Sequence, residues 1–191
     1  MYVEMYAEMA EENGKENGME MTMSDAELAK LLDCLRQRGQ TVTTVESCTG
    51  GLLAGRITDI PGSSDVFRQG FVTYCDEAKR RLVNVRRDTL ERYTAVSEQT
   101  AGEMATGGAA QAGAQACLSV TGYAGSAMED GKAQADSPEE PDDSPEETGL
   151  VYIGCYYLGN VRVRGLHLKG SRRRIRERAV DAALRLLEGC L

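Results

Sequence analysis

The sequence predicts a single α/β domain with three layers, in which helices cover both faces of a mixed β-sheet. Apolar strand patterns alternate with helical patterns over most of the chain, and the last two strand patterns are joined as a hairpin. Helices are expected on both faces because the buried faces of such a sheet need cover on each side. A length of 191 residues is sufficient for one well-filled domain.

The predicted elements follow one another in a regular order. A capping box at residues 24–27, Ser-Asp-Ala-Glu, opens a helix that ends near Gly39. The last two strands flank Gly159-Asn160, a pair typical of a hairpin turn. Strands are expected at about 41–46, 71–74, 117–121, 150–157 and 161–168, and further helices at about 49–59, 76–83, 88–93, 97–113 and 171–188.

Two acidic segments lie outside this pattern. Residues 1–23 lack a helical stripe and are predicted to be a disordered N-terminal extension, which leaves 24–191 as the domain; residues 127–148 are predicted to be a disordered insertion between two strands. Residues 1–25 carry seven acids and one lysine, and residues 127–148 carry nine acids and one lysine. Since the whole chain has a net charge of -8, the remainder carries +6 and is mildly basic.

Composition argues against several classes of protein. The six cysteines are widely spaced without a C-x-x-C motif, and His167 is the only histidine, so neither a disulfide framework nor a metal site is expected. There is no run of 18 apolar residues and no leader-like start. We therefore expect a cytoplasmic protein that does not associate with membranes.

The stretch ESCTGG, residues 46–51, connects a predicted strand to a predicted helix. Two glycines near the first turn of a helix cost about 1 kcal/mol each relative to alanine, so they indicate a compensating role, such as close approach of the backbone to a ligand. A helix N-terminus with the hydroxyls of Ser47 and Thr49 suits a phosphate or an oxyanion. The alternative is an ordinary N-cap with glycines that serve helix–sheet packing, and this stretch alone does not decide between the two.

A nucleophilic serine needs a base. His167 lies in an alternating strand pattern, where a structural role is more common, so a Ser-His-Asp triad is not expected. The stretch TYCDEAK instead supplies Tyr74 at the end of a predicted strand and Lys79 one helical turn beyond it. A lysine desolvated in a crevice there can have a pKa low enough to act as a base. The alternative for Lys79 is a solvated helix residue.

The stretch GSRRRIRER, residues 170–178, places Arg172 and Arg176 on one face of a predicted helix. A pair of guanidinium groups can hold a phosphate. A solvated helix face is the alternative. A nucleic-acid surface is disfavoured because no aromatic side chains are interleaved with these arginines.

Seven stretches together resemble the CinA C-terminal domain family, the nicotinamide-nucleotide amidohydrolases. They are ESCTGGLLAGRIT, PGSSDVF, GFVTYCDEAKRRLVNV, TLERYTAVSEQTAGEMA, SVTGYAG, TGLVYIG and KGSRRRIRERA, and they span about 24–126 and 148–190 in order. The resemblance implies deamidation of nicotinamide mononucleotide to nicotinate mononucleotide and ammonia. It also implies a small-molecule nucleotide substrate, a homo-oligomer, and no metal or other cofactor.

By matching motif positions, the resemblance implies that Ser47 is the nucleophile and that Tyr74 and Lys79 transfer protons. The residues implied to shape the anion and substrate cradle are Thr49, Gly50, Gly51, Thr121 and Gly122, with Arg172 and Arg176 in the family's G-x-R-x-x-x-R element. Chemistry alone does not distinguish Ser47 from Thr49 as nucleophile.

Some positions depart from the family's usual pattern. Cys75-Asp76 stands where serine and asparagine are usual, Tyr123 replaces an aliphatic residue, and Ser126 replaces a proline at the start of the acidic insertion. An acidic loop beside an anionic nucleotide would repel it. Substrate affinity or identity is therefore expected to differ from the family's unless the loop swings away. The alternative function is a catalytically inactive or divergent nucleotide-binding module of the same fold.

Overall fold

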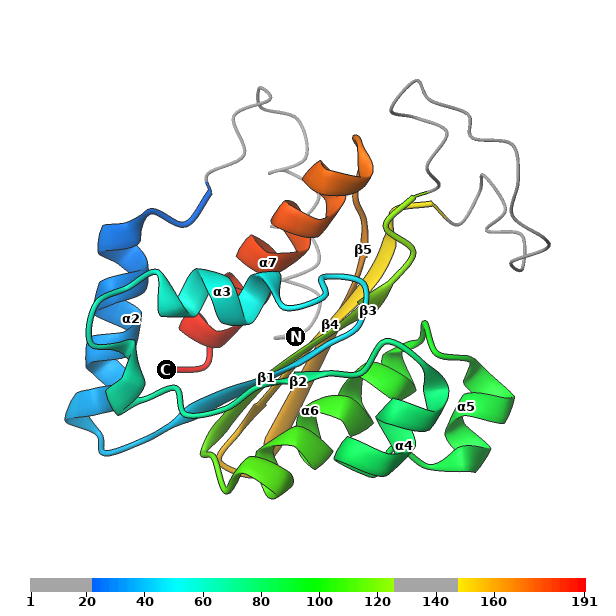
Figure 1. Cartoon of the computed structure of the whole chain (residues 1–191), viewed down its shortest axis with the longest axis horizontal. Helices are drawn as coiled ribbons and strands as arrows, with labels where there is room; N and C mark the ends of the chain where they lie inside the picture. The colour runs from blue at the N-terminus through cyan, green and yellow to red at the C-terminus, as the bar shows by residue number, and fades with distance from the viewer. Residues whose placement is uncertain (1–21, 126–147) are drawn as a thin grey trace, which may run out of the picture.

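The computed structural model describes residues 22–125 and 148–191 (Figure 1). Nearly all of the predicted extension and insertion thus lies outside the described residues. Met23, which the sequence assigned to the extension, is fully buried, and its N–H donates to the Asp181 carboxylate at 3.3 Å. The packed domain therefore includes at least one residue before the capping box.

The sheet has five strands in the order β2-β1-β3-β4-β5. β1 pairs in parallel with both β2 and β3, whereas β4 pairs antiparallel with β3 and β5. This confirms the predicted mixed sheet. The strands are β1 (Val42–Glu46), β2 (Phe71–Val72), β3 (Ala116–Gly122), β4 (Leu150–Tyr157) and β5 (Asn160–His167).

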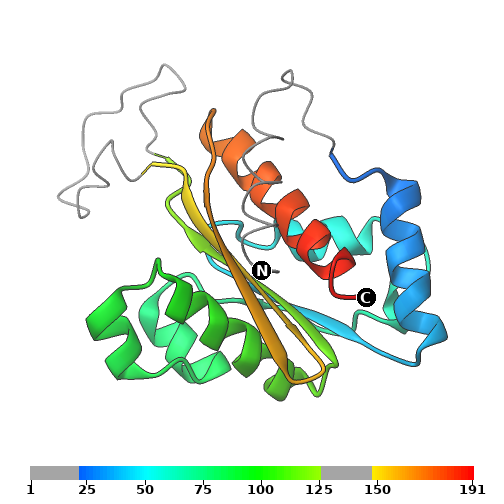
Figure 2. The same cartoon turned by 180° about the vertical axis from the view of Figure 1, so that it is seen from behind.

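Helices cover both faces of the sheet, so the predicted three-layer α/β/α architecture is confirmed (Figures 1 and 2). One face carries α2 (Asp25–Gln37), α3 (Leu52–Thr58) and α7 (Arg172–Glu188). The other face carries α4 (Asp76–Val83), α5 (Arg87–Tyr93) and α6 (Glu98–Ala112). A short 3-10 turn, Ser63–Asp65, follows α3. None of the described helices is both long and apolar enough to span a membrane.

Several element boundaries differ from the predicted ones by one or more residues. The helix expected from about 49 begins only at Leu52, because Gly50 and Gly51 have φ values of 59° and 99°, outside the helical region. The strand expected over 71–74 is limited to Phe71–Val72. The hairpin turn lies one residue earlier than predicted, at Leu158-Gly159, where both residues have positive φ.

Close packing of α4 against α6 depends on Gly107. A Cβ atom added at this position would overlap the backbone carbonyl of Val83, the last residue of α4. Backbone cannot yield to such an overlap as a flexible side chain can. α4 therefore packs directly against α6, and this contact also fixes the position of Lys79 in α4.

We expect Gly107→Ala to lower the free energy of unfolding by about 1–3 kcal/mol, because an overpacked contact must be relieved by backbone shifts. The matched control is Gly55→Ala in α3, where an added Cβ would meet nothing within 4 Å. That variant should gain up to about 1 kcal/mol from helix propensity. Denaturant unfolding of both variants measures the difference, and equal stabilities would contradict the packing argument.

Candidate active site

Ser47 and Lys79 meet in a buried contact where the parallel strands end. Ser47 directly follows β1, and Lys79 lies in the second turn of α4. The Lys79 Nζ donates to the Ser47 Oγ at 3.1 Å and to the Thr73 carbonyl oxygen at 3.0 Å. Lys79 is 1% exposed and Ser47 is 9% exposed. The structure therefore brings a hydroxyl and an amine together away from bulk water.

Burial lowers the pKa of the Lys79 amine below its ordinary value, because desolvation disfavours the charged form. The Asp76 carboxylate opposes this shift, with smaller contributions from the thiols of Cys75 and Cys48. The interpretation of Lys79 as a solvated helix lysine is wrong. A neutral amine beside a serine hydroxyl is suited to accept its proton.

A pocket of about 220 Å³ opens onto this pair. It is lined by segments that follow β1, β2 and β3, by the segment before α6 and by the start of α7. Six predicted site residues line it: Ser47, Tyr74, Lys79, Thr121, Gly122 and Arg172. The other lining residues are Cys48, Asp76, Ala95, Val96, Tyr123 and Ala124.

Tyr74 and Arg172 form the rim of this pocket. Arg172 donates from Nη2 to the Tyr74 hydroxyl at 3.3 Å and from Nη1 to the Gly125 carbonyl at 2.6 Å. Tyr74 is 64% exposed. Among the described residues, no hydrogen bond joins the Tyr74 hydroxyl to Ser47 or to Lys79. The lysine thus reaches the serine directly and without a tyrosine relay.

Thr121 and Gly122 have structural roles at the pocket wall. The fully buried Thr121 hydroxyl donates to the Ala95 carbonyl at 2.7 Å, which ties β3 to the segment before α6. At Gly122 an added Cβ would lie 2.6 Å from the Leu150 carbonyl oxygen on β4. Glycine is therefore required there by strand packing.

The two glycines of ESCTGG have a different role from the predicted anion cradle. The Glu46 carboxylate accepts hydrogen bonds from the N–H groups of Gly51, Leu53 and Ala54, at 3.0, 3.0 and 2.8 Å. The N–H of Gly50 donates to the Ser47 carbonyl. The prediction that N–H groups of the glycine pair hold a ligand anion is corrected, because internal acceptors already engage them.

Sequence reasoning missed Glu46. It is fully buried at the end of β1. The available signal was an acidic residue just before a glycine pair and a helix start, since carboxylates favour helix N-termini.

Thr49 and Arg176 are not among the residues that line the pocket. The Arg176 Nη2 donates to the Thr49 carbonyl at 2.7 Å, which braces the glycine turn against α7. In the described part of the chain, Arg176 Nε and Thr49 Oγ1 are both buried without a hydrogen-bond partner. Of the two hydroxyls that the sequence left open, only that of Ser47 contacts Lys79.

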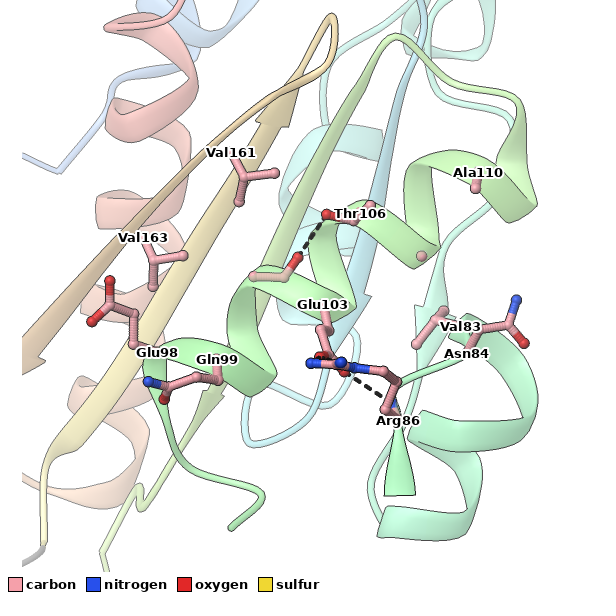
Figure 3. A pocket seen from close by; sticks show the side chains of 12 residues that line it. Val83, Asn84, Arg86, Glu98, Gln99, Glu103, Thr106, Ala110, Val161 and Val163 are labelled. Carbon is pink, nitrogen blue, oxygen red and sulfur yellow. Dashed lines mark hydrogen bonds and ion pairs between the residues drawn. The ribbon is translucent and has the colours of Figure 1, made fainter. Parts of the chain in front are cut away.

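A larger pocket of about 800 Å³ lies between α4, α6 and β5, as Figure 3 shows. Its lining contains neither Ser47 nor Lys79, and its charged pair, Arg86 and Glu103, is already joined at 2.7 Å. His167 is exposed on β5. Among the described residues, no group of three or more His, Cys, Asp and Glu side chains could hold a metal ion. The smaller pocket is therefore the candidate active site.

The lowered pKa of Lys79 predicts a specific pH dependence of stability. Between the folded-state pKa and the ordinary value of 10.5, the unfolded chain binds more protons at this residue than the folded chain does. The unfolding free energy of the wild type should therefore rise relative to Lys79→Met as pH increases through that window. Denaturant unfolding of both proteins across this range measures the difference. Parallel curves would contradict the burial argument.

Comparisons with known proteins agree with this fold and with the motifs. The family model described as the CinA C-terminal domain matches residues 25–191. A CinA-like protein from Kosmotoga olearia is 43% identical over 154 residues, which are 81% of this chain and 34% of that protein. The chain thus spans about a third of the length of the curated relatives it matches.

Solved structures give the same result. A competence-damaged protein (CinA) superfamily protein from Escherichia coli is 32% identical with a TM-score of 0.77, covering 93% of this chain and 96% of that one. A competence or damage-inducible protein from Enterobacter asburiae is 35% identical with a TM-score of 0.74, covering 88% and 99%. The chain belongs to the CinA C-terminal domain family.

Proposed function

We propose that the protein is an amidohydrolase that converts nicotinamide mononucleotide to nicotinate mononucleotide and ammonia. The observation that carries this proposal is the buried 3.1 Å hydrogen bond from Lys79 Nζ to Ser47 Oγ beside a pocket. Nucleophilic catalysis by serine needs such a base within hydrogen-bond reach. Self-association, which the family resemblance implies, and a cytoplasmic location, which the composition suggests, remain predictions.

The first half of the reaction uses the neutral form of Lys79. Its amine takes the hydroxyl proton while Ser47 Oγ bonds to the amide carbonyl carbon, which gives a tetrahedral intermediate. Collapse breaks the C–N bond, and the Lys79 ammonium returns the proton to the departing nitrogen as ammonia leaves.

The second half releases the acid product. Water attacks the ester carbonyl on Ser47 while Lys79, neutral again, accepts a proton from that water. The ester C–O bond breaks, and the proton returns to Ser47 Oγ. The products are the carboxylate nucleotide and the free enzyme.

The charges around the pocket fit a nicotinamide nucleotide. Arg172 is a cation at the rim, and the Asp76 carboxylate makes no ion pair among the described residues. Nicotinamide mononucleotide carries a cationic pyridinium ring and an anionic phosphate. The Asp76 carboxylate is opposite in charge to the ring, and the Arg172 guanidinium is opposite in charge to the phosphate. A volume of about 220 Å³ is below the range of roughly 300–1,000 Å³ typical of ligand pockets. It therefore suits the ring, with the phosphate outside at the rim.

Ammonia release from nicotinamide mononucleotide tests the proposal. Lys79→Met should lower kcat by roughly 10²–10⁴-fold, the usual contribution of a positioned general base, and Ser47→Ala should reduce release to the background rate. The matched control is Lys30→Met on the exposed face of α2, which should keep wild-type activity. Nucleotide binding without ammonia release by the wild type would support the binding-module alternative instead.

The Asp76 charge predicts a shift in the pH profile. Because this carboxylate raises the pKa of Lys79, Asp76→Asn should lower that pKa further. The rise of kcat with pH, which follows loss of the Lys79 proton, should then begin at lower pH. The control is Asp59→Asn at the exposed end of α3. An unchanged profile for Asp76→Asn would argue against Lys79 as the titrating base.

A further inference from the structure

Glu46 is a fully buried carboxylate next to the proposed nucleophile. Three backbone N–H groups, those of Gly51, Leu53 and Ala54, donate to its two oxygens. Among the described residues, no lysine or arginine forms an ion pair with it. Its charge is therefore balanced by N–H groups at the start of α3 and by the positive end of that helix.

The glycine pair makes this arrangement possible. Gly50 and Gly51 both have positive φ, so the chain turns back after Ser47. The N–H groups that follow the turn then face the side chain of Glu46. The carboxylate thus closes a loop that contains Ser47. Without the carboxylate, three N–H groups would have no acceptor, and the loop would no longer be held in place by these hydrogen bonds.

The backbone of Glu46 also connects the serine to the lysine. Its carbonyl accepts from the Thr73 N–H at 2.7 Å, and the Thr73 carbonyl in turn accepts from Lys79 Nζ at 3.0 Å. Glu46 therefore makes both connections. Its side chain holds the loop that carries Ser47, and its backbone carbonyl holds Thr73, which is the hydrogen-bond partner of Lys79.

We propose that Glu46 is a positioning residue of this site. Its carboxylate acts as an internal anion that fixes residues 47–51 and so keeps Ser47 Oγ within reach of Lys79. A purely structural role in stabilising α3 is the competing explanation. The catalytic consequence rests on the proposed amidase function, whereas the positioning itself can be tested through the reactivity of Ser47.

Glu46→Ala removes the anion and leaves its three N–H donors free. We expect kcat for ammonia release to fall by roughly 10²-fold, since a misplacement of about 1 Å can cost that much, with a smaller change in KM. Added sodium formate should restore much of kcat by supplying a carboxylate, whereas sodium chloride at the same ionic strength should not. A folded Glu46→Ala protein with wild-type kcat, or one whose loss formate does not reverse, would overturn the proposal.

The matched control is Glu27→Ala. The Glu27 carboxylate also accepts a backbone N–H at a helix start, that of Ser24 at 2.8 Å, as part of the α2 capping box. It has no connection to Ser47 of the kind that Glu46 has. This variant should lose stability, keep kcat and show no response to formate. A formate-dependent gain in Glu27→Ala would overturn the proposal, because formate would then act at a place other than the one left by the Glu46 carboxylate.

A second readout does not depend on the substrate. Phenylmethanesulfonyl fluoride should form an Oγ–S bond at Ser47 as the S–F bond breaks, with the hydroxyl proton passing to Lys79 and fluoride leaving. Intact-mass measurement follows the labelling, with Ser47→Ala as the blank. Slow labelling of Glu46→Ala that formate accelerates supports positioning even if the wild type releases no ammonia, in which case only the amidase proposal fails.

If Glu46→Ala does not fold, Glu46→Gln takes its place. Glutamine has nearly the same volume but offers one acceptor oxygen where glutamate offers two. Slower labelling of Ser47 at a near-native melting temperature is the expected result. Labelling at the wild-type rate would overturn the proposal.

Discussion

The site depends on the burial of the Lys79 amine. The amine is 1% exposed, and its two hydrogen-bond partners, Ser47 Oγ and the Thr73 carbonyl, are both uncharged. An ammonium group in such surroundings is disfavoured relative to the amine, since burial without a close counter-ion is costly. The fold offsets that cost elsewhere, through apolar packing and through the close contact of α4 with α6. A solvated lysine at the same distance from Ser47 would be mostly protonated at neutral pH and would be a poor base.

The strand order explains why these groups meet. β1 lies between β2 and β3 and runs parallel to both, so the segments that follow all three strands emerge at one edge of the sheet. Ser47, the 73–79 segment and the 121–124 segment come from these three exits, and α7 adds Arg172. Ligands of open α/β sheets are commonly bound at this edge. The antiparallel strands β4 and β5 widen the sheet and contribute no residue to the pocket lining.

Much of this architecture follows from local sequence patterns, because strong apolar periodicity is itself a local property. The capping box at Ser24 and the long helix after Ser97 are where the sequence predicts them, and the late hairpin is displaced by only one residue at its turn. The burial of Lys79 is not local, since it depends on a contact with a residue 32 positions away. Likewise, the glycine pair can be read from the sequence, but its left-handed conformation cannot. The same holds for the hydrogen bonds from the start of α3 to Glu46, because both features form only when the loop closes.

Because Glu46 accepts hydrogen bonds from the start of α3, the substrate anion of the proposed reaction would be bound elsewhere than at this helix N-terminus. The N–H groups that would attract a phosphate in an open helix terminus already have a carboxylate partner. Arg172 is the cation that lines the pocket beside the amine of Lys79. A guanidinium group has five N–H donors, and Arg172 uses one from each Nη for Gly125 and Tyr74, so donors remain for a ligand. A phosphate held at this rim would direct the other end of the nucleotide inward, where the small pocket admits a ring and presents its amide to Ser47.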